Sequence, residues 1–242
     1  MKTLKKPERY HNKVGKVQIV GVAICRLQAS SNLFCFFFKY IVLNSDMWDQ
    51  RYSEDGFAYG TNPNDFLASQ AKKLSPNSKV LCLAEGEGRN AIFLAKLGHE
   101  VMGIDSSSVG IAKAQKLAES EGVSIEAQVT DLKDFDFGEN KWDAIVSIFA
   151  HLPPPLRKSV HERAVKGLKS GGVLILEAYT PKQLEYKTGG PPVAEMMMTL
   201  DGLMSELEGL DIEFGRELER NVVEGKYHTG KAYTVQVFAR KS

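Results

Sequence analysis

From residue 78 onward, the sequence alternates short apolar runs with longer stretches of helical periodicity. The apolar runs contain few charged residues, as the strands of a parallel sheet require, because helices cover both faces of such a sheet. A chain that alternates in this way is predicted to fold into an α/β doubly wound sheet. The predicted strands are residues 79–84, 100–105, 123–129, 142–149 and 172–179.

Helices are predicted between these strands at residues 90–98, 107–122 and 155–171. The last two close with Gly122 and Gly171. Glycine commonly follows a helix C-terminus because it adopts the left-handed backbone conformation at little cost. The helices thereby supply the long crossovers that parallel strands need.

The end of the chain departs from this alternation. Residues 210–223 and 231–240 read as two strands joined by the short turn EGKYHTG, with no helix between them. Strands joined so closely must be antiparallel, because a parallel return requires a crossover of a dozen or more residues. The mostly parallel sheet therefore gains an antiparallel β-hairpin at its C-terminal edge.

The composition favours a soluble globular domain whose partner is not a nucleic acid. The chain has 242 residues, of which 43% are hydrophobic and 25% charged, an ordinary balance for one large domain. Residues 1–46 carry a net charge of +6, whereas residues 47–242 carry −5. Binding of nucleic-acid phosphates needs clustered Lys and Arg, which only the basic segment could supply.

Residues 1–46 form a basic extension whose status stays open. Its apolar run, residues 33–43, is interrupted by Lys39 and is shorter than the roughly 20 residues that span a bilayer, so we expect no stable membrane insertion. The extension is an organelle transit sequence, a real extension, or sequence upstream of a true start at Met47. We favour the last interpretation, because every motif below lies within residues 47–242, the expected catalytic domain.

Several other chemistries lack their motifs in this chain. We find no GxSxG elbow, HExxH helix or GxxxxGK[ST] loop, and the NPPY-like motif of amino-group methylation on nucleobases is missing after residue 142. The cysteines form no CxxC pair and no metal-ligand spacing, which favours a reducing, cytoplasmic location and no metal site. These cysteines are Cys25, Cys35 and Cys82.

The strand-to-helix turn LCLAEGEGRN, residues 81–90, is the strongest candidate for a ligand site. A glycine-rich turn of this kind brings a ligand close to backbone amides, and an acidic residue about 20 positions on can bind ribose hydroxyls. Asp105 ends the next predicted strand, 19 residues after Gly86. The alternative is that Asp105 only caps the following helix.

Two glutamates in this turn bear on the choice of ligand. A dinucleotide would place its anionic pyrophosphate at the helix N-terminus, where Glu85 and Glu87 would repel it unless both point to solvent. S-adenosyl-L-methionine carries a cationic ammonium and a sulfonium, which the two carboxylates would attract. The charges therefore favour S-adenosylmethionine over a nicotinamide dinucleotide.

Several segments together resemble a known family. The series VLCLAEGEGRNAIFLA, VMGID, VTDLKDFDF, WDAIVSIFAHLPP and GGVLILEAYTP, followed by the terminal hairpin, is similar to the class I S-adenosylmethionine-dependent methyltransferases. It is most similar to the small bacterial-type members related to tellurite and thiopurine methyltransferases, over residues 47–242. The resemblance implies a Rossmann-like, seven-stranded, mostly parallel sheet with helices on both faces, and S-adenosyl-L-methionine as cofactor.

The resemblance also implies a set of cofactor-binding residues. The glycine loop binds the methionine part together with the start of the first helix, the acid after the second strand binds the ribose, and the acid and backbone after the third strand contact the adenine. In this sequence these positions are Ala84, Glu85, Gly86, Gly88, Asn90, Asp105, Ser106, Asp131 and Leu132.

Two positions depart from the family pattern. Many relatives have an acidic residue where Cys82 stands and a glycine where Ala84 stands. Losing the acid removes a usual partner of the cofactor's amino group, so either Glu85 compensates or the affinity is lower. For Ala84 we expect a backbone conformation that tolerates a Cβ atom.

His151 is the candidate catalytic residue. It follows the fourth predicted strand in FAHLPPPLRK, at the sheet edge where ligands bind, and could take a proton from an acceptor. The alternative is a structural histidine bonded within a proline-rich loop. Methyl transfer itself needs little more than in-line positioning, because the sulfonium is already activated.

The acceptor is expected to be a small molecule, for example a thiol or a metalloid oxyanion. Its binding side would come from residues 180–200 and from a lid at residues 47–60. The lid carries four aromatic candidates, Trp48, Tyr52, Phe57 and Tyr59. The alternatives are a non-catalytic S-adenosylmethionine-binding regulatory domain and a nicotinamide-dependent oxidoreductase; the oligomeric state cannot be read from the sequence.

Overall fold

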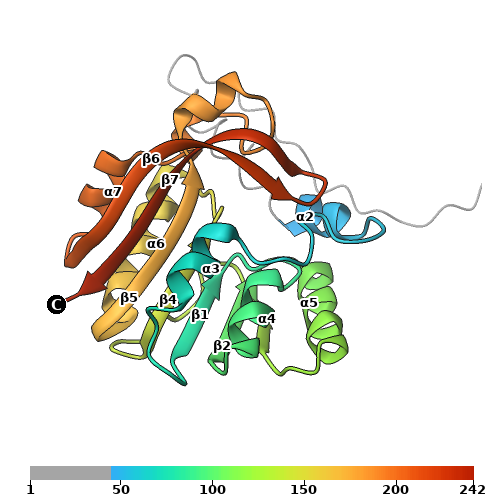
Figure 1. Ribbon diagram of the computed structural model, residues 1–242, viewed down its shortest axis with the longest axis horizontal. Helices are drawn as coiled ribbons and strands as arrows, with labels where there is room; N and C mark the ends of the chain where they lie inside the picture. Colours follow the sequence, from blue (N-terminus) through green and yellow to red (C-terminus); the bar gives the residue numbers. More distant parts are fainter. Residues whose placement is uncertain (1–44) are drawn as a thin grey trace, which may run out of the picture.

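A computed structural model describes residues 45–242, which build one seven-stranded sheet in the order β3-β2-β1-β4-β5-β7-β6 (Figure 1). Strands β1 to β5 run parallel, whereas β7 pairs antiparallel with β5 and β6. The predicted doubly wound sheet and its terminal hairpin are thus confirmed. The strands are β1 (Lys79–Leu83), β2 (Glu100–Asp105), β3 (Glu126–Val129), β4 (Trp142–Ile148), β5 (Leu168–Tyr179), β6 (Leu210–Glu224) and β7 (His228–Lys241).

Helices cover both faces of this sheet. None of the helices within residues 45–242 has the length and apolarity that crossing a membrane demands. The expectations for Cys25, Cys35 and the apolar run 33–43 lie outside the described residues. The helices are α2 (Ser45–Tyr52), α3 (Asp65–Ala71), α4 (Arg89–Lys96), α5 (Ser108–Ser120), α6 (Pro154–Gly167) and α7 (Leu200–Glu206), with 3₁₀ turns η1 (Pro181–Glu185) and η2 (Ala194–Met196).

One predicted helix end is wrong. Gly122 does follow α5 in a left-handed conformation, with φ +69°, but α6 ends at Gly167 and Gly171 lies inside β5. The last carbonyls of α6 need no glycine cap, because the amides of Asn140 and Lys141 donate to them at 3.1 and 2.8 Å. The chain therefore enters β5 directly at residue 168.

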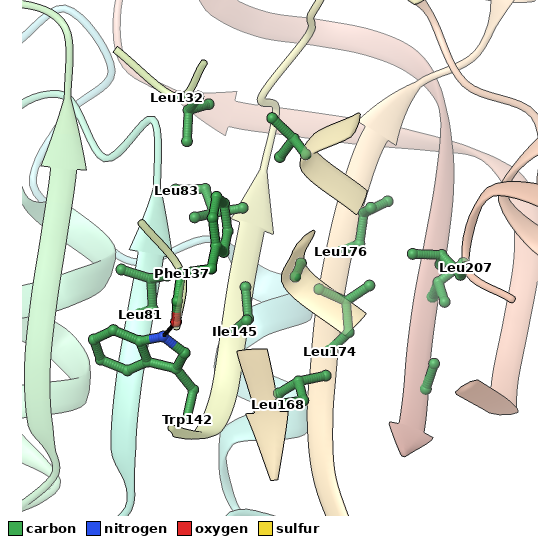
Figure 2. Packing of buried hydrophobic residues seen from close by; sticks show 14 of the residues in the cluster. Leu81, Leu83, Leu132, Phe137, Trp142, Ile145, Leu168, Leu174, Leu176 and Leu207 are labelled. Carbon is green, nitrogen blue, oxygen red and sulfur yellow. Dashed lines mark hydrogen bonds between the residues drawn. The ribbon is translucent and has the colours of Figure 1, made fainter. Parts of the chain in front are cut away.

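The alternation of side chains along the strands divides the core between the two faces of the sheet. Odd-numbered residues of β1 and β4, such as Leu81 and Ile145, pack with α6 and α7 on one face (Figure 2). Even-numbered residues such as Val80 and Val146 pack with α3 and α4 on the other. Trp142, at the start of β4, departs from this alternation and packs on the first face, where it is fully buried and its Nε1 donates to the carbonyl of Phe137 at 2.8 Å. Both faces are thus covered by apolar packing, as buried parallel strands require.

The hairpin of β6 and β7 extends beyond the parallel strands and curves toward α2 (Figure 1). At its tip, Gly225 lies so close to the backbone of Tyr59 and Gly60 that a Cβ atom at 225 would come within 2.5 Å of both. Glu54 accepts hydrogen bonds from Lys226 and Tyr227 of the same tip. The hairpin thus places the tip beside the segment that follows α2, near the carboxyl ends of the parallel strands.

Candidate cofactor site and its surroundings

The loop between β1 and α4 is joined to the end of β2 by one carboxylate. Asp105 is buried, and its Oδ2 accepts from the amide of Gly86 at 2.8 Å while Oδ1 accepts from the amide of Ser107 at 2.8 Å. The cap of α5 is Ser107, whose Oγ accepts from Gly110 at 3.0 Å. The capping role considered for Asp105 therefore belongs to Ser107. Burial raises the pKa of the Asp105 carboxyl, and the amides of Ser107 and Gly86 oppose this rise.

Ala84 does not have the backbone conformation expected from its side chain. Its φ is +48°, in the left-handed region, like Gly86 at +60° and Gly88 at +92° in the same turn. A Cβ atom in this region costs about 1–2 kcal/mol, which gives a physical reason for the glycine that many relatives carry here. The turn retains its shape in spite of this strain.

Glu85 is directed into the protein. It is buried, and its Oε1 accepts from the amides of Asn90 at 2.9 Å and Ala91 at 2.7 Å, at the N-terminus of α4. Burial raises the pKa of its carboxyl to about 7, although these two amides favour the charged form. The side chain serves as an internal cap through one of its two oxygens, and its compensation for Cys82 stays a prediction.

Glu87 is likewise occupied within the protein. Its Oε2 accepts from the amide of Ala58 at 2.7 Å, and its Oε1 lies 2.6 Å from the Nζ of Lys113. The ammonium of Lys113 also donates to carbonyls of the segment after α2. Glu87 therefore fixes that segment to the loop, and neither loop glutamate is the free negative charge that we expected.

The other predicted cofactor residues lie on both sides of Asp105. Asn90 is buried in the first turn of α4, where its Oδ1 accepts from the amide of Asn64 at 2.9 Å, and Ser106 is partly buried next to Asp105. The amide of residue 130 donates to the carbonyl of Asp105 at 2.8 Å, which brings the segment of Asp131 and Leu132 alongside. The structure thus brings all nine predicted positions to neighbouring strand ends; their contacts with the cofactor stay predictions.

Both ring nitrogens of His151 are occupied by the backbone. Nε2 accepts from the amide of Tyr179 at 2.9 Å, so Nδ1 carries the proton and donates to the carbonyl of Phe149 at 3.0 Å. The ring stacks on Tyr179 at 5.5 Å between centroids. Burial lowers the pKa of the imidazole to about 4. The catalytic role stays a prediction, and these contacts favour the structural alternative.

The predicted lid divides into two parts. Trp48, Tyr52 and Tyr59 contact one another, with ring centroids 5.7 to 6.4 Å apart. The guanidinium of Arg51 lies over the ring of Trp48 and donates to the hydroxyl of Tyr59 at 2.9 Å. Phe57 lies apart from this group, under the ammonium of Lys113 at 5.2 Å.

A buried network of charges that the sequence did not predict lies beside the site. The side-chain amide of Asn64 donates to Glu177 at 2.6 Å and to Glu224 at 2.8 Å. Each carboxylate also binds an arginine: Arg220 lies 2.8 Å from Glu177, and Arg89 lies 2.5 Å from Glu224. Asn64 and Glu177 are 0% exposed. The available signal was a lone carboxylate in the apolar strand VLILEAY, since such a charge requires a partner.

The sequence and the fold are both similar to those of known methyltransferases. Residues 80–172 match a family model described as a methyltransferase domain. The chain is 38% identical over 81 residues to the probable S-adenosyl-L-methionine-dependent methyltransferase TehB of Haemophilus influenzae, a match that covers 34% of this chain and 28% of that protein. The crystal structure of TehB from Haemophilus influenzae superimposes with a TM-score of 0.61 and 21% identity, over 82% of this chain and 67% of that chain. Residues 80–172 thus match a methyltransferase domain, and the matches together support a class I S-adenosylmethionine-dependent methyltransferase.

This methyltransferase also has a relative of a different kind. It is 30% identical over 128 residues to the tRNA (uracil(54)-C(5))-methyltransferase of Pyrococcus furiosus, over 49% of this chain and 29% of that protein. The two sequence matches thus cover less than a third of the length of this relative and of TehB. Both relatives are named as methyltransferases, but only the name of the first one states a methyl acceptor.

The residues of the methyltransferase fit S-adenosylmethionine, the cofactor of its family. Within residues 45–242 the carboxylate of Asp105 accepts two hydrogen bonds, from the amides of Gly86 and Ser107, whereas a carboxylate has about four acceptor positions. Two positions therefore stay open for two ribose hydroxyls. The α4 amides to which a dinucleotide's pyrophosphate would bind are instead taken by Glu85, which makes the site unsuited to that anion.

We expect position 84 to tolerate glycine and to reject a β-branched residue. Ala84→Gly removes the left-handed strain but loses a partly buried methyl group, so its free energy of unfolding should stay within about 1 kcal/mol of the parent. Ala84→Val should lose about 2 kcal/mol, because branched side chains fit this conformation worst. Chemical denaturation followed by circular dichroism compares the three proteins. Equal stability of the valine variant and the parent would show that residue 84 is not left-handed.

The contacts of His151 predict a pH-dependent role in stability. Its folded pKa of about 4 lies below the unfolded value, so the parent should lose stability as the pH falls from about 6.5 to 4, by up to about 1.4 kcal/mol per pH unit. His151→Phe keeps the stacked ring but removes the group that titrates. The stability difference between parent and variant, measured by urea unfolding, should therefore shrink as the pH falls. A difference independent of pH would contradict a buried, neutral histidine.

Proposed function

We propose that this protein transfers the methyl group of S-adenosylmethionine to a small-molecule acceptor, such as a thiol or a metalloid oxyanion. The observation that carries the proposal is the carboxylate of Asp105, which lies at the end of β2 and bonds to the glycine loop at Gly86. With α4 capped by Glu85, this arrangement favours a ribose-bearing ligand without a pyrophosphate. The family of the chain supplies that ligand.

The reaction asks the protein mainly to position its two ligands. Bound S-adenosylmethionine supplies an activated methyl group on a sulfonium. The chain's own part is to hold the ribose through Asp105, to hold the rest of the cofactor against the glycine loop, and to exclude water with the segment after α2. Glu87 and Lys113 fix that segment in place. His151 is bonded on both sides, so the proposal does not require it as a base.

A small molecule is favoured over a nucleic acid as acceptor. Residues 47–242 carry a net charge of −5, and a surface that binds RNA phosphates needs an excess of Lys and Arg. The tRNA methyltransferase shares with this chain a stretch that makes up only 29% of its length, so its substrate is weak evidence for the acceptor of this protein. The proposal keeps the cytoplasm as the expected location.

A non-catalytic S-adenosylmethionine-binding domain is the second candidate. It is favoured by Cys82, which is buried where many relatives have an acid, and by the internal use of Glu85. Without either carboxylate, the cofactor's ammonium loses a usual partner. The nicotinamide-dependent alternative is wrong, since the family match identifies a methyltransferase domain.

Cofactor binding tests the site directly. Asp105→Asn replaces one of the two acceptor oxygens with a donor NH₂ group and removes the negative charge. The affinity of the variant for S-adenosylmethionine should therefore fall at least tenfold, equivalent to about 1.4 kcal/mol. The matched control is Asp143→Asn, an acid at the opposite end of the sheet that bonds to Lys79 and Lys169; its affinity should stay within twofold. Titration calorimetry measures all three proteins. Equal binding by parent and Asp105→Asn would place the cofactor elsewhere.

A labelled-methyl screen then separates the two candidate functions. The acceptors are 2-mercaptoethanol, selenite, tellurite and unmodified tRNA. Turnover of a small acceptor supports the proposal, and turnover of tRNA alone would overturn the small-molecule part of it. Binding of S-adenosylmethionine with no transfer to any acceptor would favour the non-catalytic domain.

A further inference from the structure

Four rings meet where the hairpin tip lies against the carboxyl ends of β4 and β5. The ring of His228 lies 4.4 Å from Tyr59, 4.8 Å from Phe149 and 5.3 Å from Tyr179, between centroids. We call these four residues the ring cluster. Its members come from the segment after α2, the end of β4, the end of β5 and the start of β7. The cluster thus forms only when these distant segments are assembled.

Two polar atoms of the ring cluster are buried and have no hydrogen-bond partner among residues 45–242. They are Nδ1 of His228 and the hydroxyl oxygen of Tyr179. More than nine in ten buried polar groups in proteins are bonded, because an unpaired one costs about 1–3 kcal/mol. Two unpaired atoms on rings that contact each other indicate a place where a ligand supplies the missing partner. Neither atom is used by the cofactor site described above.

The ring cluster lies next to the end of the sheet where the cofactor is expected. Phe149 directly follows β4, which pairs with β1. In this pairing Ser147 lies opposite Leu83, the last residue of β1 before the glycine loop. The backbone of Phe149 is left-handed, with φ +54°, and its amide donates to the carbonyl of Glu177 at 2.7 Å. Strained residues of this kind occur preferentially at functional sites. The cluster therefore stands beside the proposed position of the methyl donor.

The charges around the ring cluster favour a neutral ligand. The arginines of the adjoining network are already paired: Arg89 with Glu224 at 2.5 Å and Arg220 with Glu177 at 2.8 Å. Arg51 is directed elsewhere, since it donates to the hydroxyl of Tyr59 at 2.9 Å and lies over the rings of Trp48 and Tyr227. Burial lowers the pKa of His228 well below its usual value, and the charge of Arg89 lowers it further, so the ring is neutral. Burying an anion requires an unpaired cation or several donors. The polar atoms in question are one imidazole nitrogen and one hydroxyl.

We propose that Nδ1 of His228 and the hydroxyl of Tyr179 bind the methyl acceptor, which is a neutral molecule with one O–H, S–H or N–H group. This inference rests on the proposed function and narrows it, because it disfavours oxyanions. The acceptor's heteroatom attacks the methyl carbon, and the carbon–sulfur bond breaks with its electron pair left on sulfur. The acceptor's proton passes to Nδ1 of His228 and from the imidazole to solvent. The neighbouring aromatic rings exclude water from the reacting atoms.

The test measures acceptor binding in the full-length protein saturated with S-adenosylhomocysteine. The probes are phenol, aniline and benzyl mercaptan, which are neutral at pH 7, and selenite as the anion. The variants are His228→Phe and Tyr179→Phe, which keep the rings and remove the polar atoms. Tyr186→Phe is the matched control, because this tyrosine bonds to Glu219 on the exposed side of the hairpin at 2.6 Å. Thermal unfolding confirms that each variant is folded.

We expect at least one neutral probe to bind and to shift the ¹⁵N resonance of the His228 ring, whereas selenite does not. His228→Phe and Tyr179→Phe should each weaken that binding at least fivefold, with affinity for S-adenosylhomocysteine within twofold of the parent and of Tyr186→Phe. The inference is overturned if no neutral probe shifts the resonance, if both variants bind the probes like the parent, or if selenite alone binds. If the parent fails to bind S-adenosylhomocysteine, the proposed function falls first, and the inference with it.

Discussion

The structure around the site depends on one side-chain amide, that of Asn64. It is completely buried, and it donates to two carboxylates that come from sequence positions 113 and 160 residues away. Those carboxylates, Glu177 and Glu224, are neutralised by arginines from α4 and β6. Removal of one partner from such a buried group typically lowers the free energy of unfolding by about 3–5 kcal/mol, because it leaves a buried charge without compensation. The amide thus joins α4, β5, the hairpin and the segment before α3 into one unit.

The glycine loop shows the same internal use of charge. Glu85 caps α4, Glu87 fixes the segment after α2, and Asp105 joins the loop to β2. Of these three carboxylates, Asp105 is the one with an arrangement suited to a ribose. A loop that satisfies its own helix N-terminus has no need of a phosphate there. A turn built in this way is poorly suited to the pyrophosphate of a dinucleotide.

The fold was predictable from sequence because its signals are local. Apolar runs and turn residues identified all seven strands except for their ends. The position of Asp105 after its strand predicts the cofactor site, and that site stays a prediction. Errors arose where distant residues decide a local question. The sequence predicts Gly171 as a helix cap, but the amides of residues 140 and 141 bond to the last carbonyls of α6 instead. The left-handed backbone of Ala84 is likewise one that alanine disfavours, so its own residue type does not predict it. The network could not be paired from sequence, since each contact depends on the assembled hairpin.

The most direct measurement is hydrogen exchange in Asn64→Asp. This variant keeps the oxygen that caps α3 by accepting from Leu67, but replaces the donor amide with an oxygen that faces two carboxylates. The account predicts that backbone amides at residues 57–60 and at the hairpin tip, residues 222–230, lose protection together, while α3 and strands β1 and β4 keep theirs. Unchanged protection in both segments, or a loss confined to α3, would contradict the claim that Asn64 holds the site together.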